Sequence, residues 1–199
     1  GQTASSSYDV VINGTEAAQA VVHTKFGDLI PSTSALSGAG VELVGTENRE
    51  YVLKNALEPL RQDYDVILID CPPSLELLTL NALCAADSVL IPVQCEYYAL
   101  EGLSDLMTTM RGVKRRLNPR IEIFGVLLTM YDGRTNFSAQ VAEEVRRHFP
   151  GKVFAAMIPR NVRLCEAPSH GVPVFAYDRF SRGAQAYLAL AEEILRKLR

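Results

Sequence analysis

An aspartate at the end of an apolar run is the first candidate for chemistry in this sequence. Residues 65–70 read DVILID, a pattern typical of a strand buried on both faces, and Asp70 ends it. A carboxylate at the end of such a strand can reach a Mg²⁺ ion, usually through water. The same residue type also caps loops and helices. Taken alone, Asp70 indicates either magnesium binding or local capping.

Other polar side chains follow further apolar runs. We expect strands at residues 65–70, 88–93, 121–130 and 153–158, and helices at residues 47–62, 74–86, 99–117, 137–149 and 181–198. Strands and helices that alternate in this way favour an α/β fold, with a mostly parallel, doubly wound sheet and helices on both faces. Such folds bind ligands at the carboxyl ends of the strands. The site should therefore lie among residues 70–73, 94–96, 129–132 and 159–161.

Composition and charge limit the class of protein. The chain has 199 residues, of which 48% are hydrophobic and 22% charged, so it suits one α/β domain and excludes general disorder. No apolar run is long enough to span a bilayer, and the first residues lack the pattern of a secretory signal. The net charge is −3, with an acidic first half and a basic second half. This asymmetry is compatible with a surface for phosphate or nucleic acid and also with solvated helix faces.

Four long segments match a known family in their sequence and in their order along the chain. Residues 64–103 read YDVILIDCPPSLELLTLNALCAADSVLIPVQCEYYALEGL, residues 125–141 read GVLLTMYDGRTNFSAQV, residues 158–174 read IPRNVRLCEAPSHGVPV, and residues 177–194 read YDRFSRGAQAYLALAEEI. They resemble the ParA/Soj chromosome- and plasmid-partitioning ATPases, which are deviant-Walker, MinD-like P-loop NTPases. The resemblance covers nearly the whole chain and is strongest after Glu47.

The resemblance implies a site for ATP and Mg²⁺. Asp70 would be the Walker B acid, a catalytic residue that holds the metal through water. The nucleotide-binding residues it implies are Asp70, Pro72, Met130, Pro159, Asn161 and Val162. Considered alone, Pro159 could instead end a strand, and Asn161 could cap the short helix after it, with or without a role in binding. Gly1 and Gln2 look like the tail of the family's D-P-Q-G-N switch motif.

The resemblance also implies a surface for double-stranded DNA, carried by Arg134 and Arg163. Arg134 follows Gly133 in a loop, and Arg163 lies one turn into a short helix. Binding without sequence preference rests on neutralising phosphates and should weaken steeply with salt. Each arginine could instead form a surface ion pair, for example Arg163 with Glu166 at helical spacing.

The family's phosphate loop does not occur in this sequence. No G-x-x-x-x-G-K-[ST] is present, and the one Gly-Lys pair, Gly151 and Lys152, is followed by Val153. We therefore expect residues 1–199 to form a single partial P-loop domain without its N-terminal phosphate-loop unit. We also expect the chain not to hydrolyse ATP by itself, and an apolar strand edge to lie open where the missing strand would pair.

The function implied is chromosome or plasmid partitioning. ATP would join two subunits into a homodimer, the dimer would bind DNA, and a ParB-like protein would release it. The protein would be cytoplasmic, associated with the nucleoid, and without a stable membrane anchor. Two alternatives remain: a MinD-like membrane-surface ATPase, for which residues 181–199 would have to act as an amphipathic anchor, and an inactive truncated fragment.

Overall fold

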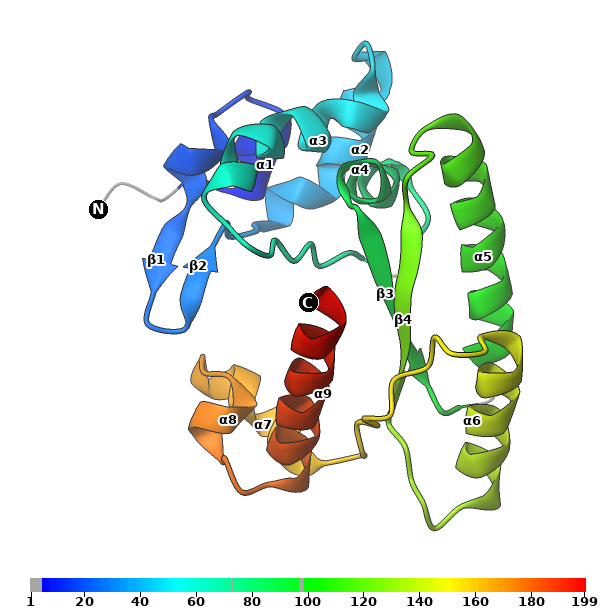
Figure 1. The fold of residues 1–199 in the computed structure, drawn as a ribbon. Coiled ribbons are helices and arrows are strands. Elements are labelled where there is room, and N and C mark those ends of the chain that lie inside the picture. The colour runs from blue at the N-terminus through cyan, green and yellow to red at the C-terminus, as the bar shows by residue number, and fades with distance from the viewer. Residues whose placement is uncertain (1–4, 73, 97–98) are drawn as a thin grey trace. The chain divides into compact units, whose positions relative to one another are not determined.

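The computed structural model describes residues 5–72, 74–96 and 99–199 (Figure 1). It divides into two compact units. The first contains residues 1–88 and 108–121, and the second contains residues 89–107 and 122–199. The expectation of one partial domain stays a prediction.

Short helices and one hairpin make up the first unit. The helices are α1 (Ser7–Val11), α2 (Ala39–Glu42), α3 (Val52–Leu57) and α4 (Leu77–Ala85), with 3₁₀ turns at Ala17–Ala20, Ser34–Gly38, Leu43–Gly45, Arg49–Tyr51 and Glu58–Gln62. The hairpin pairs β1 (Val22–Thr24) with β2 (Gly27–Leu29) in antiparallel register. A small core holds the amino-terminal part together through Val10, Ala17, Ala20 and Leu60.

A buried amide joins the helices of this unit. Asn81 is 1% exposed. Its side-chain Nδ2 donates to the carbonyl of Arg49 at 2.8 Å, and its Oδ1 accepts from the backbone N–H of Leu53 at 3.1 Å. Because a buried amide costs free energy unless it is hydrogen-bonded, these bonds fix α4 against the start of α3.

The prediction of a strand at residues 65–70 is wrong. No strand is formed there, and the Leu68 side chain is 90% exposed. A strand is stable only when a neighbouring strand accepts and donates its backbone hydrogen bonds. Within the described ranges no strand pairs with residues 65–70, so the apolar run lies extended and open.

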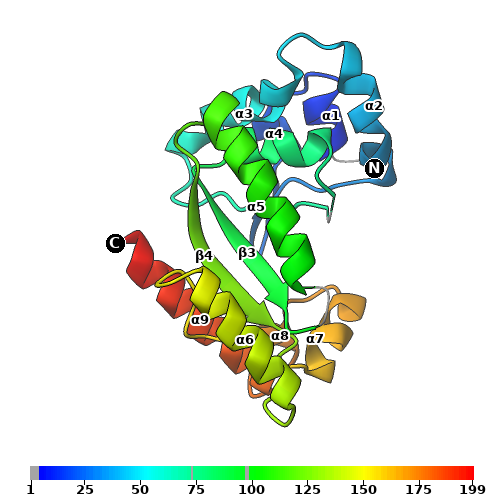
Figure 2. The same ribbon diagram turned by 90° about the vertical axis from the view of Figure 1, so that its right-hand side faces the viewer.

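A parallel sheet with helices on both faces forms the second unit. Strands β3 (Ser88–Gln94) and β4 (Glu122–Thr129) run side by side. Between them the chain passes through α5 (Ala99–Arg116), and α6 (Asn136–His148) follows β4. The remaining elements are α7 (Val162–Glu166), the 3₁₀ turn Ala167–His170, α8 (Val174–Tyr177) and α9 (Arg182–Leu198). Helix α6 lies on one side of the two strands and α9 on the other (Figures 1 and 2), so the expected α/β class is confirmed.

In place of the strand expected at residues 153–158, the structure has two separate parallel bridges, one to β4 and one to the residues just after it. Val153 bridges Val126, and Pro159 bridges Tyr131. Between the bridges the backbone N–H groups of Ala155 and Ala156 donate to the Glu193 carboxylate on α9, at 3.0 and 3.1 Å. The segment is therefore bulged, because Glu193 binds the N–H groups of two consecutive residues, of which a regular strand would turn only one toward β4.

A close contact fixes this bulged segment against β4. Phe154 is 1% exposed and packs with Leu127, Ile158 and Leu190. A Cβ placed on Gly125 would lie 2.4 Å from the Phe154 ring. Only glycine leaves room for that approach, so Gly125 helps to set where residues 159–163 emerge at the end of the sheet.

Within the described part of the chain, the helices are all too short or too polar to cross a membrane.

Candidate functional site

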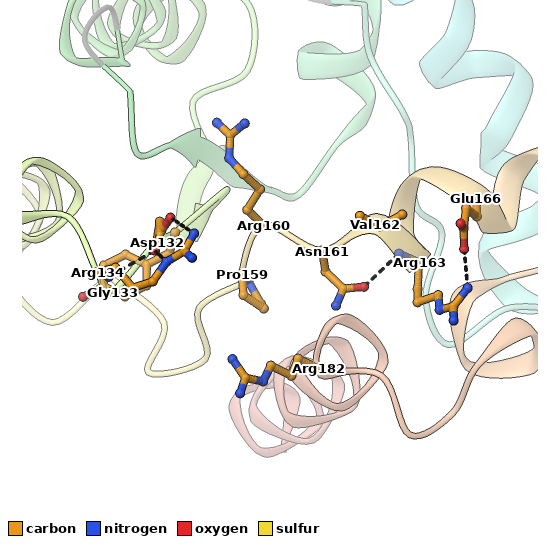
Figure 3. Close-up of a pocket in the computed structure, with 11 residues that line it drawn as sticks. Asp132, Gly133, Arg134, Pro159, Arg160, Asn161, Val162, Arg163, Glu166 and Arg182 are labelled. Carbon is orange, nitrogen blue, oxygen red and sulfur yellow. Dashed lines mark hydrogen bonds and ion pairs between the residues drawn. The ribbon is translucent and has the colours of Figure 1, made fainter.

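A pocket of about 840 Å³ lies at the carboxyl end of β4 in the second unit (Figure 3). Three segments line it: residues 131–134 after β4, residues 159–163 after the bulged segment, and the positions Glu166 and Arg182. The backbone hydrogen bonds Tyr131 N–H to Ile158 carbonyl (3.1 Å) and Arg160 N–H to Tyr131 carbonyl (3.2 Å) hold the first two segments together. The pocket thus lies at the strand ends, where this class of fold binds ligands.

Met130 marks the point at which the chain leaves β4. Its φ of 53° is left-handed, a conformation that costs a non-glycine residue free energy and that clusters at functional sites. Met130 lines a second, neighbouring pocket of about 380 Å³, whose lining includes Cys95, Phe137 and Ser138. Asp132 and Arg160 line both pockets, so the two are adjacent.

A bidentate ion pair holds Arg134. Its Nε donates to Oδ1 of Asp132 at 2.9 Å and its Nη2 to Oδ2 at 2.7 Å. The backbone N–H of Arg134 also donates to Oδ1, at 3.0 Å. These bonds favour the charged carboxylate and lower the pKa of Asp132 to about 2. The Arg134 side chain is nevertheless 88% exposed, so its outer face is open to solvent.

Arg163 is held in a similar way at the start of α7. Asn161 caps this helix, and its side chain accepts a hydrogen bond from the Arg163 backbone N–H at 3.0 Å. The guanidinium donates from Nη1 to Glu166 at 2.7 Å, and its Nε lies 3.3 Å from an Asp178 oxygen. The sequence alternatives for both residues, a helix cap at Asn161 and an Arg163–Glu166 ion pair, are thus present, and neither excludes a ligand contact.

Two more arginines belong to the pocket. Arg160 lies in the strand-end segment 159–161, where the sequence predicts the site, and it donates to Glu96 at 2.7 Å. Arg182 begins α9 and points toward the opening near Pro159 (Figure 3), and its side chain makes no hydrogen bond or ion pair with the other described residues. Nothing in the sequence around Arg182 predicts its place in the pocket, because the pocket joins residues far apart in the chain. Together the four guanidinium groups could bind phosphate oxygens.

The structure brings five predicted site residues into one pocket: Arg134, Pro159, Asn161, Val162 and Arg163. Asp70 and Pro72 belong to the first unit, where both are exposed. Gly1 and Gln2 lie outside the described residues.

The magnesium site expected at Asp70 relies on one carboxylate that acts through water. In the part of the chain that the structure describes, no group of three His, Cys, Asp or Glu residues could hold a metal ion. Asp70 is one exposed carboxylate, and magnesium needs near-octahedral oxygen coordination. Magnesium binding at Asp70 stays a prediction.

Comparisons with known proteins agree with the sequence motifs. A family model described as an AAA domain matches residues 1–123. The sporulation initiation inhibitor protein Soj of Bacillus subtilis is 56% identical over 94% of this chain and 75% of its own length. The chromosome partitioning protein ParA of Myxococcus xanthus is 56% identical over 87% of this chain and 61% of its own length.

A solved structure gives the same result for the fold. The cobyrinic acid a,c-diamide synthase from Mycobacterium smegmatis, solved with a bound ATP analogue and magnesium, is 38% identical and superposes with a TM-score of 0.83. The match covers 96% of this chain and 72% of that chain. With the sequence relatives, this shows that the chain belongs to the ParA/Soj family of chromosome-partitioning P-loop ATPases.

Proposed function

We propose that this chain belongs to an ATP-dependent partitioning switch that binds double-stranded DNA without sequence preference. The observation that carries the proposal is the gathering of Pro159, Asn161 and Val162 with Arg134 and Arg163 around one pocket. ATP joins two copies into a homodimer, DNA binds the dimer, and a ParB-like partner releases it. The protein works in the cytoplasm at the nucleoid.

The pocket residues suit a nucleotide base. Pro159 and Val162 offer apolar surface, and Val162 is 69% exposed. The Oδ1 of Asn161 is used by the helix cap, while its side-chain nitrogen points into the pocket (Figure 3). An amide donor beside apolar walls can fix the orientation of a purine. Met130, in the neighbouring pocket, is a further proposed contact.

Hydrolysis requires groups beyond those that this pocket provides. Asp70 is proposed as the acid near Mg²⁺, with Pro72 beside the nucleotide. The 199 residues contain no phosphate-loop motif, so they lack the backbone N–H cradle and the lysine that bind the β- and γ-phosphates. We therefore propose that residues 1–199 by themselves do not hydrolyse ATP.

A DNA retention assay on the natural full-length polypeptide tests the switch. DNA binding is measured with and without Mg·ATP over a series of salt concentrations. Arg134→Gln and Arg163→Gln should each weaken binding on all sequences alike, and each should reduce the salt slope by at most about 1. Arg147→Gln, which alters an exposed arginine on α6 outside the pocket, is the matched control. Equal retention with and without nucleotide would contradict the proposal.

The membrane-surface alternative has one supporting feature. Helix α9 buries Ala184 and Leu190 but leaves Leu195 and Leu198 57% and 52% exposed, as an interfacial helix would. Sedimentation with anionic liposomes separates the two functions. Sedimentation of Mg·ATP-bound protein that Leu195→Gln abolishes would favour a membrane surface over DNA.

A further inference from the structure

Carboxylates neutralise most of the arginines at the pocket. Asp132, Glu96 and Glu166 each lie within 2.7 Å of one guanidinium nitrogen. Among the described pocket arginines, Arg182 alone is without such a partner. An incoming phosphate at Arg163 therefore competes with an anion that the protein already supplies.

Glu166 is the best placed of these competitors. It lies three residues after Arg163 on α7 and accepts from its Nη1 at 2.7 Å. The hydroxyl of Tyr177 donates to the same carboxylate at 3.2 Å, and the Tyr177 ring stacks on His170 with 4.8 Å between ring centroids. Glu166 thus has a second hydrogen-bond donor, Tyr177, which does not depend on Arg163.

The pair is weak enough to exchange. The Arg163 and Glu166 side chains are 49% and 37% exposed, and ion pairs at such sites contribute little to stability because water and salt screen them. A phosphate that displaces Glu166 leaves a carboxylate beside itself, and the repulsion between these like charges opposes binding.

We propose that Glu166 is a positioning residue that limits DNA affinity by holding Arg163 and competing with phosphate for it. The inference rests on the proposed function, because it requires that Arg163 binds DNA. A lower affinity for DNA allows the DNA complex to dissociate more readily. Glu166 also reduces the number of counterions released, since it attracts a cation once Arg163 leaves it.

The test is Glu166→Gln in the natural full-length polypeptide with Mg·ATP, measured by DNA binding over a salt series. Glutamine keeps the shape and still accepts from the Tyr177 hydroxyl. We expect affinity to rise about two- to fivefold and the salt slope to steepen by up to about 0.9. A merely structural role for Glu166 would leave the salt slope unchanged.

Glu144→Gln is the matched control. Glu144 accepts from Arg147 at 2.8 Å across the same three-residue spacing, its side chain is 33% exposed, and neither residue lines the pocket. Glu144→Gln changes the net charge by the same amount as Glu166→Gln, so it reports the effect of charge alone. Equal gains for both variants would overturn the inference.

Two further variants complete the design. Glu166→Gln should raise affinity by less on the Arg163→Gln background than in the wild type, because without Arg163 the competitor holds no guanidinium and only its charge remains to be removed. Asp178→Asn removes the second carboxylate at Arg163, 3.3 Å from its Nε. It should raise the affinity and steepen the salt slope as Glu166→Gln does, and it replaces Glu166→Gln in the test if that variant fails to fold. If Glu166→Gln, or Asp178→Asn in its place, binds DNA with wild-type affinity and an unchanged salt slope, the inference about Glu166 is wrong and the proposed function still stands. Absence of DNA binding by the folded wild type defeats the proposed function as well.

Discussion

The Asp132–Arg134 pair determines the charge state at the mouth of the pocket. The pKa of Asp132 is lowered to about 2, first by the hydrogen bonds from the Arg134 side chain and then by those from its backbone N–H. A lowered pKa means that the folded state favours the carboxylate. Its contribution to stability is full above the ordinary pKa of about 3.9 and disappears as the pH falls through about 2. Between pH 5 and 8 the pair should therefore not titrate.

A carboxyl-carbon NMR titration checks this. We expect the Asp132 signal to titrate with a midpoint near 2 in the wild type, and the midpoint to rise toward about 3.9 in Arg134→Gln. Arg147→Gln, whose guanidinium contacts Glu143 and Glu144 instead, should leave the Asp132 midpoint in place. A wild-type midpoint near the ordinary value would mean that the bidentate pair does not persist in solution.

At the scale of elements, the contact between Gly125 of β4 and the Phe154 ring fixes the position of the bulged segment beside β4. In Gly125→Ala the new Cβ would lie 2.4 Å from the ring, so the ring or the strand must move. We expect a loss of about 1–3 kcal/mol in the free energy of unfolding, measured by urea denaturation. Gly112→Ala is the control, because nothing lies within 4 Å of its Cβ in helix α5, and alanine there should stabilise by about 0.5–1 kcal/mol. Similar effects of the two substitutions would contradict the packing described.

The Glu193 carboxylate joins α9 to the bulged segment. It accepts hydrogen bonds from the backbone N–H groups of Ala155 and Ala156. Glu193→Ala should lower the free energy of unfolding by about 1 kcal/mol in the same urea assay. Glu192→Ala, one residue earlier and exposed, should change it by less than about 0.5 kcal/mol. If the two substitutions cost the same, the carboxylate does not support the bulge.

At the scale of the whole chain, the apolar run at residues 65–70 exposes three consecutive large hydrophobic side chains, Val66, Ile67 and Leu68. Leu68 is 90% exposed, so Leu68→Lys should change the free energy of unfolding of the 199-residue chain by less than about 0.5 kcal/mol. Because exposed apolar segments promote self-association, the same substitution should reduce light scattering at high concentration. Leu127→Lys, at a residue 4% exposed, should unfold the chain. A large loss of stability from Leu68→Lys would show that this run is buried in solution.

The sequence by itself predicted most of the helices and strands that apolar spacing marks along the chain. Apolar spacing placed α4, α5, α6 and α9 and the strands β3 and β4, with ends displaced by a few residues. The sequence also offered the cap at Asn161 and the ion pair of Arg163 with Glu166 as alternatives, and both are present. Both could be read from the sequence because they join residues within one helical turn. Family membership followed from long motifs for the same reason, since they can be read along the chain.

Only the tertiary structure decided the features that depend on distant partners. Residues 65–70 carry a strand pattern, yet a strand needs a hydrogen-bonded neighbour, and residues 153–158 were bulged by Glu193 from a helix almost forty positions later. The pairing of Arg160 with Glu96 and the presence of Arg182 in the pocket have the same origin. Side-chain and backbone periodicity encode what a segment can form, whereas hydrogen-bond and charge partners depend on which segments the fold brings within a few ångströms.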